Sequence, residues 1–234
     1  MSSPDGCQAA RLRGPPSLRS AAALLLLLPL LPPPAAAAPL PLAAASDSSG
    51  EAEPEEAGAR RAALPDCEAL AWLLHARAAR LQEEMCEKFT VCENSMEMLV
   101  QNNLNLPKVT EEDGCLLAGF DEEKCLKKLS SGLFTFQTYL EYIQETFTSE
   151  KQKVESLCYS TKHLATTIRQ MVINPDEVVI PDSATQKSLL TKLKSDKTWI
   201  EKITTHLILR DFTSFMEKTV RAVRYLKNTR SFSV

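Results

Sequence analysis

The sequence is poor in the residues that most catalytic and phosphate-binding sites need. It has seven glycines and three histidines in 234 residues, and the histidines (His75, His163 and His206) are far apart. No HExxH, GxSxG or glycine-rich phosphate loop occurs. The net charge of −3 gives no overall basic field for nucleic acid. We therefore expect no enzyme, no cofactor and no nucleic-acid partner.

Most of the prolines lie in the first 65 residues, which differ in character from the rest of the chain. Three arginines precede the apolar run AAALLLLLPLL at residues 21–31, a pattern typical of a secretory signal peptide. A transmembrane anchor is the alternative, but prolines such as Pro29 and Pro32 would interrupt its helix. We predict a signal peptide over 1–38 (with 45 as an alternative cleavage point), a flexible acidic tail over 39–65, a helical domain over 66–228 and a C-terminal tail over 229–234. Such a protein is secreted and leaves the membrane once the signal is removed.

If the chain is secreted, disulfide bonds between its cysteines are favoured, because an exported chain meets an oxidising compartment. Pairing of Cys86 with Cys92 and of Cys115 with Cys125 would close two small loops. A structural zinc site is the alternative, although the C-x5-C and C-x9-C spacings differ from the usual ligand spacing. Cys67 and Cys158 are left over, and we expect them to be free, partly buried thiols.

After residue 66 the apolar residues recur at steps of three and four, which predicts amphipathic helices and an all-α fold. The first stripe runs through Leu70, Leu73, Leu74, Ala78, Leu81 and Met85. The second runs from Leu126 to Phe147 and the third from Val154 to Met171. A fourth helix is predicted from about Ser183 to Asn228. Asp121 is suited to cap the second helix.

Loop lengths predict the topology of these four helices. A helix of about 24 residues spans roughly 36 Å. To start a parallel neighbour, the chain must travel back over that distance, which takes a connection of at least ~11 residues. The connections over 90–120 and 173–183 are long enough, whereas the one near Thr148 is too short. We therefore predict an up-up-down-down bundle with two long crossover loops, an arrangement associated with growth hormones and long-chain cytokines.

Two surface features are open to more than one interpretation. Eleven Lys and Arg residues follow Gln186 against four acids, and Lys218, Arg221, Arg224 and Lys227 form a basic ridge with a spacing of three. The ridge is either a solvated helix end or a surface for an acidic partner, for which arginine is well suited. Trp199 is either part of the core or an exposed interaction anchor.

Four segments are specific enough to compare with known families: NNLNLPKVTEEDGCLLAGFDEEKCL (102–126), YLEYIQ (139–144), SLLTKL (188–193) and TTHLILRDF (204–212). They resemble the interleukin-6 family of cytokines. The two cysteine spacings also match those of the family. The similarity runs from about Met85 to Arg224, and many surface positions depart from the mammalian pattern. The resemblance therefore indicates a non-mammalian member.

The resemblance implies a secreted cytokine that assembles two receptor types through three surfaces, with immune and acute-phase roles. The first surface would bind the interleukin-6 receptor α chain through Phe120, Arg221 and Arg224, with Leu116 where the family usually has an aromatic residue. The other two surfaces would engage copies of the shared signal-transducing glycoprotein subunit. Their implied contact residues are Leu73, Arg77, Ser160 and His163 for the second surface, and Trp199, Leu99 and Asn102 for the third.

Two other functions are compatible with helical periodicity. One is a different long-chain cytokine, such as granulocyte colony-stimulating factor, against which the THLILR segment argues. The other is a secreted lipid-binding protein built from exchangeable amphipathic helices. Such helices would need neither crossover loops nor small disulfide loops.

Overall fold

The computed structural model describes residues 54–92, 100 and 104–231. Its α-helices are α1 (Pro54–Phe89), α3 (Glu122–Thr146), α4 (Lys151–Met171), α5 (Ser183–Leu193) and α6 (Thr198–Ser231). Short 3-10 turns lie in the connections: η1 (Glu111–Asp113), η2 (Thr148–Glu150) and η3 (Pro175–Glu177). The described residues contain no strand, so the predicted all-α class is confirmed.

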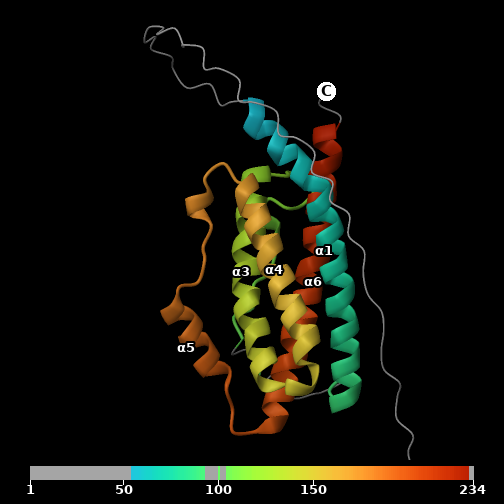
Figure 1. Ribbon diagram of the computed structural model, residues 1–234, viewed down its shortest axis with the longest axis vertical. Coiled ribbons are helices and arrows are strands. Elements are labelled where there is room, and N and C mark those ends of the chain that lie inside the picture. The colour runs from blue at the N-terminus through green and yellow to red at the C-terminus, as the bar shows by residue number, and fades with distance from the viewer. Residues whose placement is uncertain (1–53, 93–99, 101–103, 232–234) are drawn as a thin grey trace, which may run out of the picture. The chain divides into compact units, whose positions relative to one another are not determined.

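Four of these helices form the bundle, and their directions confirm the predicted topology. In Figure 1, α1 and α3 run in one direction, whereas α4 and α6 run in the other. The main packed pairs are α1 with α6, α3 with α4, and α1 with α4. The up-up-down-down order follows from chain geometry, since among the three connections between the bundle helices only the one from α3 to α4 is short.

The apolar stripes meet in one core. On α3 the stripe is buried along almost its whole length, from Leu126 to Ile143, and α4 and α6 bury theirs in the same way. Leu73 is the exception: it was predicted in the α1 stripe but is exposed, because Leu74 already takes the inward position. Gly132 is needed where α3 approaches α6, since a Cβ there would lie 2.4 Å from Cζ of Phe215.

The predicted fourth helix is wrong in extent. It breaks after Leu193, and α5 packs against α3 instead of continuing along the axis of α6. Figure 1 shows α5 standing beside the bundle as part of the second crossover. The side chain of Asp182 caps α5 by accepting from the backbone N–H of Thr185 (2.7 Å).

Both ends of the helical domain are also longer than predicted. Helix α1 begins at Pro54, so the expected flexible tail over 39–65 is helical in its last part. Proline suits the first helical position, and the residues after it are mainly strong helix formers. Helix α6 continues to Ser231, past the expected start of a C-terminal tail at 229. The predicted signal peptide over 1–38 lies outside the described residues.

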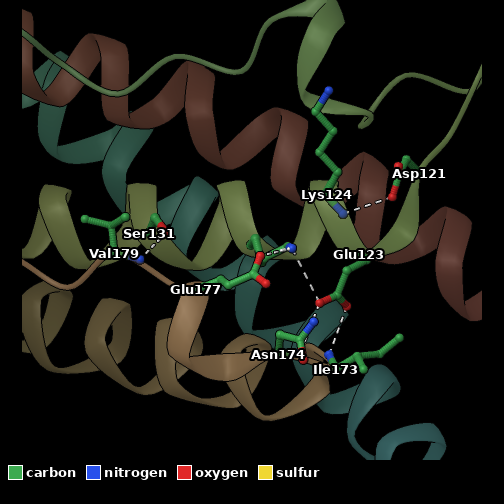
Figure 2. A network of polar contacts seen from close by, with 9 residues as sticks. Asp121, Glu123, Lys124, Ser131, Ile173, Asn174, Glu177 and Val179 are labelled. Carbon is green, nitrogen blue, oxygen red and sulfur yellow. Dashed lines mark hydrogen bonds and ion pairs between the residues drawn. The ribbon is translucent and has the colours of Figure 1, made fainter.

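The second crossover is held against α3 by side chains on one helix face. The Glu123 carboxylate accepts from the backbone N–H groups of Ile173 (2.9 Å) and Asn174 (3.1 Å). Two turns further along, the Ser131 hydroxyl accepts from the N–H of Val179 (2.9 Å). Figure 2 shows these contacts, together with the predicted cap of α3, in which Asp121 accepts from the N–H of Lys124. The start of the crossover is therefore attached to the bundle before the chain leaves for α5.

Two disulfides form as predicted. Cys86 bonds Cys92 at the end of α1, and Cys115 bonds Cys125 between the first crossover and α3. Within the described residues no group of His, Cys, Asp and Glu side chains is arranged to hold a metal ion. None of the described helices combines the length and apolar character needed to cross a bilayer.

The remaining two cysteines are free and buried, and their chemistry can be tested. Burial raises the pKa of Cys67 to about 12 and that of Cys158 to about 12. Because the thiolate is the nucleophile, the native protein without its leader should react very slowly with thiol reagents at neutral pH. Denaturation without reductant should release two reactive thiols, measured by titration with a chromogenic disulfide. Rapid labelling of the native protein would contradict this prediction.

Candidate functional site

The first candidate surface lies where α6 ends and α3 begins. We call it the α6-end surface and define it by Leu116, Phe120, Arg221 and Arg224. The ring of Phe120 packs on that of Tyr225 in α6, with centroids 4.7 Å apart. Leu116 and Arg221 line one hollow together with Cys115. The four residues predicted for this surface are thus gathered at one end of the bundle, although the first two lie about a hundred positions before the two arginines in sequence.

The loop that carries Leu116 and Phe120 is fixed by its own chemistry. The Cys115–Cys125 disulfide ties its start to the first turn of α3. Gly114 has φ of 70°, and its carbonyl accepts from the N–H of Asp121 (2.9 Å). A Cβ at Gly114 would lie 2.8 Å from that of Asp121, so glycine is required there. The loop therefore leaves Leu116 exposed and Phe120 partly buried.

The two arginines of the α6-end surface also have partners within the chain. Arg221 pairs with Glu217 one turn earlier in α6. Nε of Arg224 donates to Oε1 of Glu68 in α1 (2.8 Å), and Nζ of Lys227 donates to Oε2 of the same carboxylate (2.6 Å). Hydrogen bonds from Lys227 and Arg224 lower the pKa of Glu68. The Arg224 side chain is still 56% exposed, so an external partner can reach it.

The second candidate surface lies on α1 and α4, and we call it the α1–α4 surface. Leu73 and Arg77 are exposed one turn apart on α1, while His163 is exposed and Ser160 half-buried on α4. An η nitrogen of Arg77 donates to the hydroxyl of Ser156 (3.2 Å), which links the two helices. The structure thus brings the four predicted residues onto neighbouring helices.

The third candidate surface is centred on Trp199 in the first turn of α6, and we call it the Trp199 surface. The indole is 42% exposed, so it is not a core residue. It lines a groove formed with α5 and the crossover before it. Val100 lines the same groove, whereas Leu99 and Asn102 lie outside the described residues.

Two exposed aromatic residues, one on α1 and one on α4, were missed by the sequence reasoning. Trp72 is 56% exposed and stacks on His75, with ring centroids 5.7 Å apart. Tyr159 on α4 is 76% exposed. A signal was present in the sequence, because both aromatic residues fall off the apolar stripes of their helices. Large exposed aromatic side chains are common anchors in protein interfaces.

Comparison with known proteins decides the family. A model of the Interleukin-6/G-CSF/MGF family matches residues 39–226, which is most of the chain. The chain belongs to this family. Interleukin-6 of Gallus gallus is 84% identical over 195 residues, covering 83% of this chain and 80% of the relative. Interleukin-6 of Saimiri sciureus is 41% identical over 180 residues, covering 76% of this chain and 85% of the relative. The two values fit the predicted non-mammalian member of the interleukin-6 family.

A solved structure supports the fold. One chain of a cytokine/receptor complex superposes with a TM-score of 0.61 at 22% identity, covering 69% of this chain and 96% of that chain. At this level of sequence identity the match shows only that the two chains share a fold. Together with membership of the interleukin-6 family, it identifies the chain as a long-chain helical cytokine. The alternative of an exchangeable lipid-binding helix protein is not supported, since the four bundle helices bury their stripes in a common core.

Proposed function

We propose that the protein is a secreted cytokine that binds the interleukin-6 receptor α chain and then recruits the shared signal-transducing subunit. The observation that carries the proposal is the α6-end surface, where Phe120 packs on Tyr225, the residue after Arg224, while Leu116 and Arg221 line one hollow. Arginine and exposed aromatic side chains are the residue types that dominate binding energy in interfaces. The α chain would bind here through acidic and apolar groups of its own.

The three surfaces suit a mechanism of receptor clustering without chemistry. The α6-end surface and the Trp199 surface lie toward opposite ends of α6, and the α1–α4 surface lies on a different helix pair. Separate patches on one disulfide-linked bundle can hold several receptor chains at once. Occupying the first patch raises the effective concentration of the next receptor chain at the membrane. The predicted leader over 1–38 supports export to the extracellular space, where the protein would meet these receptors.

The experiment that tests the proposal is binding of the soluble α chain to Arg224→Ala. Loss of an interface arginine should weaken binding by about 2 kcal/mol or more, which is roughly a thirtyfold rise in Kd. Alanine is a better choice than glutamate, because a carboxylate there would repel Glu68. The fold should be retained, since the Arg224 side chain is more than half exposed and Glu68 keeps its bond to Lys227.

The matched control is Lys151→Ala, which removes an exposed cation at the start of α4, at the opposite end of the bundle. It should leave the Kd unchanged in the same surface-plasmon-resonance assay. If Arg224→Ala binds the α chain as tightly as the parent protein, the α6-end surface is not the binding site and the proposal fails.

A further inference from the structure

Glu68 occupies an unusual place among the acidic residues of α1. Its two carboxylate oxygens each accept from a different cation of α6, at 2.8 Å from Nε of Arg224 and at 2.6 Å from Nζ of Lys227. The Glu68 side chain is only 17% exposed, whereas that of Arg224 is 56% exposed. The contact joins residues that are 156 positions apart and lies where α1 packs along α6 (Figure 1). A partly buried acid thus holds the base of an outward-facing arginine.

The hydrogen bond from Arg224 to Glu68 uses the Nε–H group of the guanidinium and not the η nitrogens at its end. A guanidinium has five N–H donors, one on Nε and four on the two η nitrogens. Glu68 accepts from Nε, so the pair of η nitrogens is not consumed by this contact. That pair is a fork through which a guanidinium can recognise a carboxylate in bidentate fashion. Lys227 holds the second oxygen of Glu68 and thereby fixes the plane of the carboxylate.

We propose that Glu68 is a positioning residue of the α6-end surface, which orients the Arg224 guanidinium so that its fork faces an acidic group of the α receptor. The inference rests on the proposed function, because it assigns Glu68 a role through Arg224. Holding a long side chain in its bound orientation removes an entropy cost that binding would otherwise carry. Glu68 itself need not touch the receptor.

The test combines Glu68→Gln, Arg224→Ala and the double variant in α-chain binding. Glu68→Gln should raise the Kd roughly three- to tenfold, as expected for one side chain that must now be ordered on binding. In the Arg224→Ala background the same change should have no further effect, because there is no guanidinium left to position. Glu68→Asp, which keeps the charge, should restore part of the affinity. Glu83→Gln, at an exposed acid of the same helix, is the charge-matched control and should bind like the parent.

A second readout follows Arg224 without the receptor. In ¹⁵N-edited NMR spectra, the Nε–Hε resonance of Arg224 should be protected from solvent exchange in the parent protein and lose that protection in Glu68→Gln. An equal loss of affinity from Glu68→Gln with and without Arg224 would show a structural role and overturn the inference, as would unchanged or tighter binding of the single variant. Unchanged binding of Arg224→Ala would instead overturn the proposed function itself, and the inference with it.

Discussion

Replacing Trp199 with alanine is expected to weaken recruitment of the signal-transducing subunit strongly while leaving affinity for the α receptor unchanged. Trp199 is a large aromatic side chain that is 42% exposed, in the first turn of α6. Tryptophan is among the residues most often found at interface hot spots, where truncation costs at least about 2 kcal/mol. The α6-end surface lies toward the other end of the same helix, so its binding should not change. Affinity for the preformed complex with the α chain should therefore fall by roughly thirtyfold or more.

The prediction separates an interface role from a packing role. Because the indole is well exposed, its loss should change the free energy of unfolding by only about 1 kcal/mol or less. Asp196→Ala, an exposed change just before α6, is the matched control and should signal normally in a receptor-bearing reporter cell. If Trp199→Ala lost binding of both receptor types, or melted far below the parent, the residue would be structural and the Trp199 surface would not exist.

The bundle itself could be predicted from sequence because its determinants are local. The stripe on α3 recurs at helical spacing from Leu126 to Ile143, and every position on it is buried. Asp121 caps α3 as expected of an acid followed by two further acids. The topology then followed from loop length, since a short turn at Thr148 permits only an antiparallel pair. Each of these inferences depends on residues that are close in the chain.

The helix boundaries were predicted wrongly in two places. The first error arose because apolar periodicity does not show whether a helix continues along the same axis or ends and turns. Leu190, Leu193 and Ile200 continue the apolar spacing of α6, so a single helix from Ser183 was a natural reading of the pattern. The chain instead turns between Leu193 and Thr198, because the apolar side of α5 packs against α3 while α6 packs along α1. The start of α1 was missed for a different reason. Few large apolar residues precede residue 66, yet strong helix formers extend the helix back to Pro54.

For the candidate surfaces, the sequence indicated which residue types are suited to binding, whereas only the fold shows which of these residues lie next to one another. Nothing in the spacing of Glu68 and Arg224 indicates that they meet, since the contact exists only when α1 lies along α6. The exposure of Leu73 next to buried Leu74 likewise depends on how α1 is rotated toward the core. Part of the α6-end surface could be predicted from the residues alone, because the basic ridge is visible in the spacing of lysines and arginines along one helix.

Phe136→Ala is expected to be the most damaging single change to stability. Phe136 is fully buried on α3, and its ring packs on Phe212 and Phe215 of α6 with centroid separations of 5.2 Å in each case. Truncating a buried phenylalanine costs about 3–5 kcal/mol through lost burial and the cavity left behind. This is a large part of the roughly 5–15 kcal/mol that stabilises a typical domain. The midpoint of thermal unfolding should fall by about 10 °C or more, measured by circular dichroism with both disulfides intact.

Phe120→Ala provides the matched control, because it removes the same atoms from a partly exposed position at the end of the bundle. It should cost little more than about 1 kcal/mol of the free energy of unfolding, yet weaken binding of the α chain. Phe136→Ala, studied below its unfolding transition, should bind the α chain normally. The two variants would thus separate the residue that holds α3 to α6 from the residue that the proposed receptor reads. Equal destabilisation by both changes would mean that the ring of Phe120 is a structural part of the core and not of a binding surface.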